Sequence, residues 1–202
     1  MHYSYEITKQ MEIRMEAFQP KPDDPALELV GNKTPITLKN VKFSEWASEE
    51  THCFQATIYM YGKRTMKVSN DGQGAPNQYY HTNGQSSEEF KRQFEQAIKI
   101  GENYIKDSRE EGWEEWINKL AGTSELLDWL VSDLLNEYLT LKEMRTKMRT
   151  KTIYYDKRLK KVFQYNQKPT PEALAVYRKE QVHALFFNEL PEAEAFYYWR
   201  KI

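Results

Sequence analysis

The sequence predicts an α+β fold, and three observations support this. Apolar residues alternate between positions 36 and 69, repeat with a helical period from residue 86, and form short segments separated by turn residues after 151. We expect an N-terminal antiparallel β-hairpin sheet, central helices with one long amphipathic helix, and a C-terminal ββαβα unit. The three regions are 1–85, 86–150 and 151–202, forming one compact domain or two closely packed ones.

The composition indicates a folded protein of a reducing compartment. Aromatic residues make up 14% of the 202 residues, which disordered chains lack, although the mean hydropathy is −0.85. Cys53 is the one cysteine, so an internal disulfide is excluded. We find no N-terminal leader and no apolar run of the length, about 20 residues, that a bilayer requires. We expect a cytoplasmic protein with no membrane contact.

The first 35 residues are the least regular part of the pattern. In residues 1–18, apolar side chains on odd positions favour a strand, whereas Ile7, Met11, Met15 and Phe18 also fit a helical stripe. Residues 19–35 contain four prolines and are predicted to be a loop.

Strand patterns dominate residues 36–69. The alternation slips by one position near Lys39-Asn40, which predicts a β-bulge. Two alternating segments then flank Gly62 and predict a hairpin with a three-residue turn at Tyr61-Gly62-Lys63.

Helical patterns follow. Ser86 and Glu89 match a capping box, and the stripe that follows extends to Ile105. A short helix around 113–120 is expected to end at Gly122. A long helix then begins after Thr123 or Ser124 and keeps one apolar face for about seven turns.

The C-terminal region combines short strands and helices. Residues 152–155 and 161–165 flank a polar turn and predict a hairpin. A helix is expected over 172–180, a short buried strand over 183–188, and a last helix with Pro191 in its first turn.

The segment 68–81, VSNDGQGAPNQYYH, is the first candidate for a ligand site. It lacks the lysine of a phosphate loop, and Asn70, Asp71, Gln73 and Asn77 offer only one charged oxygen ligand. His52 and Cys53 are adjacent in a strand and point to opposite faces, so they cannot jointly ligate a metal. We expect no metal and no cofactor, and interpret the segment as a corner where the sheet ends. Glu49, Glu50 and Asp71 remain an alternative as the paired carboxylates of an enzyme.

The net charge of −1 conceals two opposed regions. Residues 102–137 hold ten acidic and three basic residues, and residues 142–161 hold nine basic and two acidic ones. The acidic segment could imitate a nucleic acid or dock on a basic partner, and the acidic residues that we predict to form this surface are Glu110, Glu111, Glu114 and Glu115. The basic residues that could instead track a nucleic acid, with aromatic neighbours, are Arg145, Lys147, Arg149, Lys151, Lys157 and Arg158.

Residues 48–80 resemble a pattern of uncharacterised bacteriophage and prophage accessory proteins. The matching residues are Ser48, Glu49, Glu50, Thr51, Cys53, Phe54, Ala56, Tyr59, Gly62, Lys63, Asn70, Asp71, Gly72 and Gly74. A Leu-Thr-Leu-Lys segment, a basic run, a hairpin and Asn188-Glu189-Leu190 also resemble that family. The family often has a second glycine after Gly74, where this chain has Ala75-Pro76. The resemblance implies a small viral accessory protein.

Our first functional hypothesis is that the chain is a phage-encoded interaction protein that acts in the host cell cytoplasm. It would bind and inhibit or redirect a host protein or nucleoprotein complex, as an anti-defence (anti-CRISPR-like) protein does. The alternatives are a nucleic-acid-binding module using residues 142–165 and an enzyme with carboxylates near the 70–81 loop. The long helix could also support a homo-oligomer.

Overall fold

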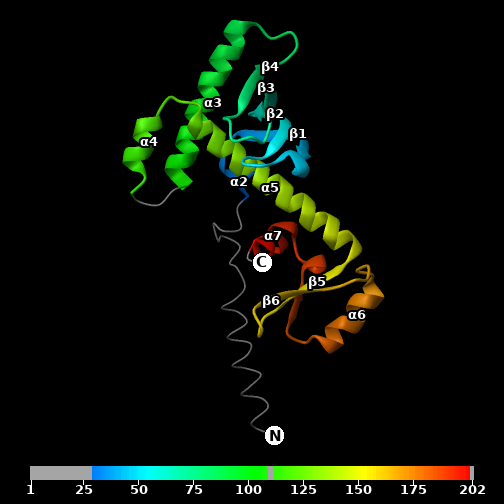
Figure 1. Ribbon diagram of the computed structural model, residues 1–202. Helices are drawn as coiled ribbons and strands as arrows, with labels where there is room; N and C mark the ends of the chain where they lie inside the picture. Colours follow the sequence, from blue (N-terminus) through cyan, green and yellow to red (C-terminus); the bar gives the residue numbers. More distant parts are fainter. Residues whose placement is uncertain (1–28, 109–111, 201–202) are drawn as a thin grey trace. The chain divides into compact units, whose positions relative to one another are not determined.

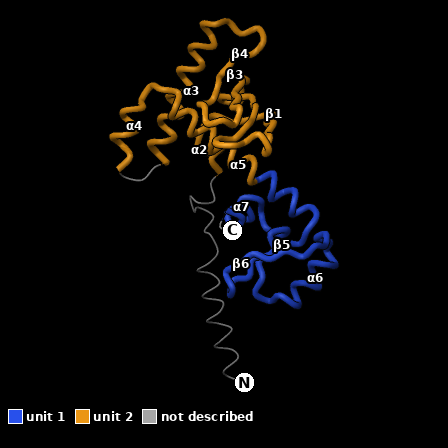
Figure 2. The backbone as a smooth tube through the Cα atoms, in the orientation of Figure 1, with its two compact units in different colours: residues 1–28, 141–202 blue, residues 29–140 orange. Residues whose placement is uncertain are grey.

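The computed structural model describes residues 29–108 and 112–200 and confirms the α+β class (Figure 1). The strand or helix predicted over residues 1–18 lies outside the described residues. The described residues divide into two compact units, unit 2 with residues from 29 to 140 and unit 1 with residues from 141 to 200 (Figure 2). The division falls inside the long helix α5, Glu125–Thr150. Each unit is therefore described by itself.

Unit 2 contains a four-stranded antiparallel sheet with the strand order β1-β2-β3-β4. The strands are β1 (Ile36–Ser44), β2 (Cys53–Met60), β3 (Lys63–Asn70) and β4 (Gln78–His81). The prediction that the sheet ends within residues 68–81 is wrong, because residues 78–81 form a fourth strand. This four-residue strand forms through its pairing with Met66–Ser69 of β3, a contact that no local pattern reveals.

The sheet carries two register shifts. The first lies between Lys39 and Lys42 and confirms the predicted bulge, with Asn40 at a φ of 54°. The second lies beside Thr65 in β3 and was not predicted. The β2–β3 turn has two residues, not three, because Tyr61 and Gly62 both adopt the positive φ of a type I′ turn.

Two helices pack on one face of this sheet. They are α3 (Ser87–Ser108) and the first part of α5, and Ser86 caps α3 by accepting the Glu89 N–H. The short helix α4 (Glu114–Leu120) contacts α3. The buried residues of β2 form one core with apolar residues of α3 and α5. Gly122, with a φ of 79°, follows α4 as predicted.

A short helix α2 (Val30–Lys33) corrects the prediction of a loop over 19–35. A helix of a single turn is not stable by itself. The carboxylate of Glu137 on α5 accepts the N–H groups of Val30 and Gly31 and fixes this turn. The contact spans 107 positions of sequence, which explains why local reasoning missed it.

Unit 1 is built on a three-stranded sheet with the order β6-β5-β7. The strands β5 (Thr152–Asp156) and β6 (Lys161–Tyr165) form the predicted hairpin, and β7 covers Ala184–Phe186. α6 (Pro171–Glu180) and α7 (Glu192–Trp199) confirm the two predicted helices. Tyr154, Phe186 and Leu174 form the core on the α6 side.

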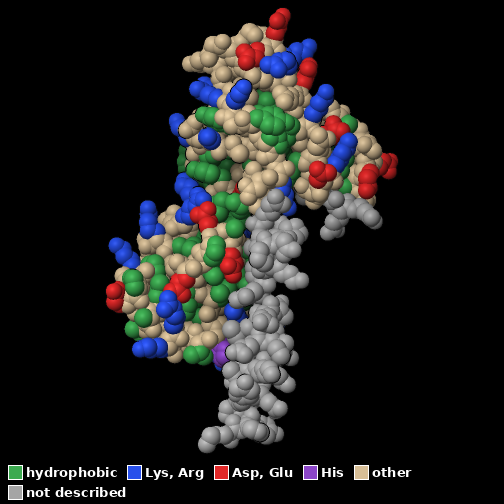
Figure 3. Space-filling view, turned by 180° about the vertical axis from the view of Figure 1, so that it is seen from behind, with side chains coloured by type: hydrophobic (Ala, Val, Ile, Leu, Met, Phe, Trp, Pro, Cys, Tyr) green, Lys and Arg blue, Asp and Glu red, His purple; other side chains and the backbone are tan. Residues whose placement is uncertain are grey.

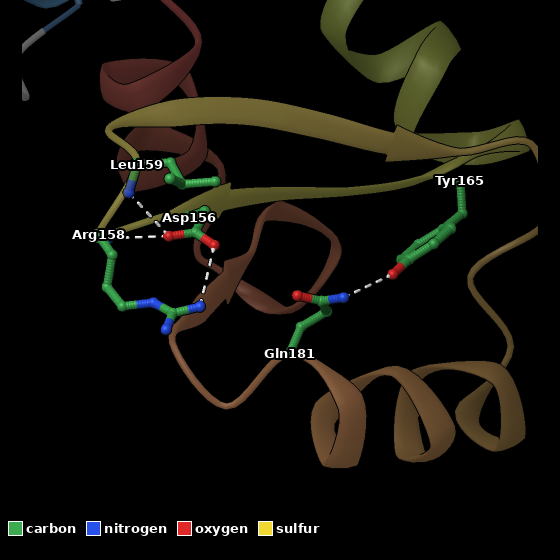
Figure 4. A network of polar contacts seen from close by, with 5 residues as sticks. All are labelled: Asp156, Arg158, Leu159, Tyr165 and Gln181. Atoms are coloured by element: carbon green, nitrogen blue, oxygen red, sulfur yellow. Dashed lines mark hydrogen bonds and ion pairs between the residues drawn. The ribbon is translucent and has the colours of Figure 1, made fainter.

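Asp156 closes the turn between β5 and β6 (Figure 4). Its Oδ1 accepts the backbone N–H groups of Arg158 at 2.8 Å and of Leu159 at 3.0 Å. These donors lower the pKa of the Asp156 carboxyl, with the Leu159 amide contributing most. On the α6 side, the Gln181 amide donates to the Tyr165 hydroxyl at 3.1 Å.

Candidate functional site

The side chain of Asn70 organises the segment that we call the Asn70 loop, residues 70–77. Its Oδ1 accepts hydrogen bonds from the Thr51 hydroxyl and the Gly72 N–H, both at 2.8 Å. Its Nδ2 donates to the Ala75 carbonyl at 2.8 Å and to Asn77 Oδ1 at 3.1 Å. The two stretches of the phage-like pattern, 48–51 and 70–74, therefore bind each other.

The carbonyl of Gly72 accepts three consecutive backbone N–H groups. The donors are Glu49 at 3.0 Å, Glu50 at 2.9 Å and Thr51 at 3.2 Å. Successive N–H groups of this kind can form an anion site. Here they bind the loop's own carbonyl, so this arrangement holds the corner of the sheet instead of a phosphate.

Gly72 must be glycine at this position. Its φ is 91°, and a Cβ there would lie 2.0 Å from the Ala47 carbonyl oxygen. That contact is with backbone and cannot be relieved by a side-chain rotation. The glycine thus allows both the positive φ and the close backbone packing of this corner.

A cleft of about 710 Å³ lies beside this loop, and we call it the acidic cleft. It is bordered by the 3-10 turn η2 (Glu45–Ala47), by residues 48–52, by the Asn70 loop and by the first turns of α5. Its carboxylates are Glu45, Glu49, Glu50, Glu125 and Asp128, and its apolar walls include Phe43, Phe54, Trp129 and Leu135. Among the described residues that line it, none is lysine or arginine.

Asp128 connects the cleft to the edge strand β4. Its Oδ1 accepts a hydrogen bond from the Tyr79 hydroxyl, and Asn77 also donates to its carboxylate. Burial in the protein raises the pKa of the Asp128 carboxyl and also the pKa of the Tyr79 phenol. A cation placed in the cleft would favour the ionised form of Asp128 and would oppose this shift.

The structure separates the three carboxylates that were candidates for an enzyme. Glu49 and Glu50 line the acidic cleft, whereas Asp71 lines a different cavity. The Asp71 Oδ1 accepts the Gln73 N–H at 3.2 Å, as in an ordinary Asx turn. The three side chains therefore do not share one cavity.

The predicted acidic surface is only partly described. Glu114 and Glu115 lie exposed in the first turn of α4, and Glu114 accepts the Gly112 N–H at 2.9 Å. Glu110 and Glu111 lie outside the described residues. None of these four residues lines the acidic cleft.

The predicted basic surface lies in unit 1, and part of its charge is paired. Arg145 makes a bidentate contact with Glu192, at 2.7 and 2.6 Å. Lys147 pairs with Glu143 at 2.7 Å, and Arg158 lies 4.0 Å from Asp156. Arg149 is exposed, whereas Lys151 and Lys157 are half-buried.

The aromatic residues of that basic segment pack inside unit 1. Tyr154 stacks on Phe163 and Tyr165, each with ring centroids 5.5 Å apart, and Tyr155 stacks on Tyr198. Such rings contribute to the core of the unit. Tyr154 is buried, whereas Tyr155, Phe163 and Tyr165 are half-buried.

The two histidines near the sheet have protein partners. His52 Nε2 lies 2.8 Å from Asn136 Oδ1, and the His81 ring packs edge-on against Phe90. Within residues 29–108 and 112–200, no three His, Cys, Asp or Glu side chains gather in a way that could hold a metal ion. In the same part of the chain, no helix has the length and apolar character needed to span a membrane.

Comparisons with protein-family models, curated proteins and solved structures found no match. The functional interpretation therefore rests on the geometry of the acidic cleft. Sequence reasoning missed the contribution of α5 to this cleft. The signal was a stripe on the helix with the spacing i, i+3, i+4, i+7, formed by Glu125, Asp128, Trp129 and Ser132.

Proposed function

We propose that this protein is an interaction protein that binds a basic segment of a partner protein in the acidic cleft. The single observation that supports this is the lining of the cleft, which combines five carboxylates with apolar walls and has no lysine or arginine among its described residues. Complementary charge of this kind steers association and selects partners.

The chemistry of the walls favours lysine or arginine side chains as the bound groups. Such side chains bury their aliphatic stems against apolar surface and leave the charged head near polar groups. Trp129 lines the cleft and is stacked on Trp116, with ring centroids 4.2 Å apart, and tryptophan is the best aromatic partner for a cation. Glu49 and Glu50 offer carboxylates to the charged head.

Trp46 extends the proposed interface beyond the cleft. It lies in η2, next to Glu45, and its side chain is 90% exposed. Tryptophan is enriched among the residues that contribute most to binding at protein interfaces. We propose that Trp46 is buried when the partner binds.

The resemblance of residues 48–80 to phage accessory proteins supports a viral role for this interaction. In this proposal the partner is a host protein or nucleoprotein complex of the cytoplasm, and binding inhibits or redirects it. An anti-defence function is the form of this proposal that we favour, because nucleic-acid-handling proteins expose basic surfaces.

Charge reversal in the cleft tests the proposal. The full-length protein is titrated with a fluorescent arginine- and lysine-rich peptide, and then used to capture partners from host lysate. We expect the E49K/E50K variant to bind the peptide about tenfold more weakly or worse, a loss of about 1.4 kcal/mol. The W46A variant should lose captured host protein while it keeps its fold by circular dichroism.

The matched control is E114K/E115K, which reverses two exposed charges on α4 outside the cleft. It changes the net charge by the same amount. Equal losses in both variants would show that total charge, and not the cleft, determines binding. Unchanged affinity of E49K/E50K would refute the proposal.

A further inference from the structure

The face of the unit 2 sheet that points away from the core carries basic and aromatic side chains, and we call it the outer face. In β2, Phe54, Ala56 and Ile58 are buried on the inner side. Because strand side chains alternate, Gln55, Thr57 and Tyr59 lie on the outer face. Residues paired directly across antiparallel strands share a face, so the register assigns the neighbouring strands as well.

The register places four basic residues on the outer face. Lys39 pairs with Thr57, Lys42 with Gln55, Arg64 with Tyr59, and Lys67 with Thr57. All four basic side chains are exposed.

The two register shifts place two of these four basic residues, Lys42 and Arg64, on the outer face. Without the extra residue between Lys39 and Lys42, the alternation would turn Lys42 toward the inner face. The shift beside Thr65 acts in the same way on Arg64, since Met66 pairs with the inward-facing Ile58. Thr65 itself is buried and donates to the Ile58 carbonyl at 3.0 Å.

No negative side chain interrupts this surface within the strands. β1, β2, β3 and β4, all of them described, contain no aspartate or glutamate. Figure 3, seen from behind, shows Lys and Arg side chains along the left side of the upper part of the molecule. The outer face thus has the opposite charge to the acidic cleft in the same unit.

Two tyrosines lie among these cations. The Lys39 Nζ lies 4.5 Å from the centre of the Tyr59 ring. Tyr80 on β4 is 46% exposed, pairs with Lys67, and donates its hydroxyl hydrogen to the Gln78 side chain. Tyr59 is half-buried, with Lys39 over its ring, so the exposed ring of this surface is that of Tyr80. An exposed tyrosine ring beside lysines provides a stacking surface and phosphate contacts together.

The end of the outer face near the Asn70 loop is hollowed. A cavity of about 500 Å³ there is lined by Lys42, Gln55, Ser69 and Gln78, with Asp71 at the same end. The amide side chains of Gln55 and Gln78 are exposed and can both donate and accept hydrogen bonds. Such groups suit the polar edges of unpaired bases.

We propose that the outer face binds single-stranded nucleic acid. The backbone phosphates contact Lys39, Lys42, Arg64 and Lys67, and an unpaired base stacks on Tyr80. Stacking on rings that lie in a sheet requires bases that are not paired within a duplex. The surface therefore selects a single strand over a double helix, and it is distinct from the acidic cleft and from residues 142–165.

Fluorescence anisotropy with the full-length protein tests this inference. The probes are labelled single-stranded DNA and RNA of about 12 nucleotides, and the same DNA as a duplex. We expect binding of a single strand that weakens steeply between about 50 and 200 mM salt. The DNA and RNA arms show which sugar is preferred.

Three variants separate the roles of ring and charge. Y80A should weaken binding about tenfold with an unchanged salt dependence, and Y80W should restore it, because the ring supplies stacking. K67A should weaken binding and lower the slope of log K against log salt by about 0.7, the value for one phosphate contact on a single strand. Circular dichroism and thermal unfolding check the fold of each.

The control is K99A, which removes an exposed charge on α3. It should bind the single strand as the unchanged protein does. Equal affinity for duplex, no effect of Y80A, or the same loss in K99A as in K67A would each overturn the inference. A loss that appears in R149A/K151A and not in K67A would assign binding to residues 142–165 instead and would also overturn it.

Discussion

At the scale of single residues, Asn70 shows how one amide can define a corner of a sheet. It uses both ends of its side chain, accepting from Thr51 and Gly72 and donating to Ala75 and Asn77. The residue is buried, so its amide would lack water as well as a protein partner if these bonds were broken. The loop geometry therefore depends on the identity of this one side chain.

The loss of stability on substituting Asn70 should depend on which of its hydrogen bonds remain. We expect N70A to lower the free energy of unfolding by about 2–3 kcal/mol, since it removes accepting and donating groups at a buried site. N70D keeps the accepting Oδ1 but sets a second carboxylate oxygen against the Ala75 carbonyl at this buried site, and should cost at least as much as N70A. Chemical denaturation measures both, with N83A, at an exposed position, as a control expected within about 0.5 kcal/mol of the unchanged protein. A loss in N70A no larger than in N83A would contradict this role.

The lowered pKa of Asp156 predicts that the stability of the β5–β6 turn depends on pH. Its pKa is lowered in the folded protein, first by the Leu159 N–H and then by the Arg158 N–H. A lowered pKa means that the carboxylate stabilises the folded turn above its ordinary pKa of about 3.9, and that this contribution is lost as pH falls through the lower folded value. NMR titration should show the Arg158 and Leu159 amide shifts changing below about pH 3.9. The D156N variant should not show this transition, and its appearance there would assign the titration to another group.

At the scale of elements, local pattern predicted the structures that depend on local physics. The capping box at Ser86, the apolar stripe of α5, the hairpin of unit 1 and the bulge after Lys39 all follow from residues close in sequence. α2 and β4 were missed because each depends on a distant partner, Glu137 for α2 and the strand β3 for β4. The acidic cleft was missed for the same reason, since η2 and α5 are brought together only by the fold.

The close approach of α3 and α5 rests on Gly101. A Cβ at this position would lie 2.8 Å from the Cα of Leu127 and 2.9 Å from its N atom. Alanine favours a helix over glycine by up to about 1 kcal/mol, but here its methyl group would meet backbone that cannot rotate away. We expect G101A to lower the free energy of unfolding by about 1–3 kcal/mol, a sign opposite to helix propensity.

Denaturation of G101A beside Q96A tests this. Gln96 is exposed on the same helix, so its replacement by alanine changes propensity without changing the contact with α5. Q96A should be neutral or slightly stabilising. If G101A were as stable as Q96A, α3 and α5 could move apart to accommodate the methyl group, and the prediction for Gly101 would be wrong.

At the scale of the whole molecule, a net charge of −1 conceals two surfaces of opposite sign on unit 2. The acidic cleft lies beside the Asn70 loop, and the basic outer face lies on the side of the sheet away from the core. The chemistry of the acidic cleft suits a basic protein segment, and that of the outer face suits a single-stranded nucleic acid. A protein with both would be suited to a partner that itself carries nucleic acid.

The two surfaces should act independently, and a double-mutant cycle measures this. Distant sites without shared partners contribute additively, to within about 0.5 kcal/mol. E49K/E50K should weaken binding of the basic peptide and leave single-stranded nucleic acid bound as before or slightly tighter, because it removes negative charge. K67A should do the reverse. In the variant that combines all three substitutions, the affinity for the peptide should fall by the factor seen in E49K/E50K, and the affinity for the single strand by the factor seen in K67A. A peptide affinity that changes strongly with K67A alone would show that one surface serves both ligands.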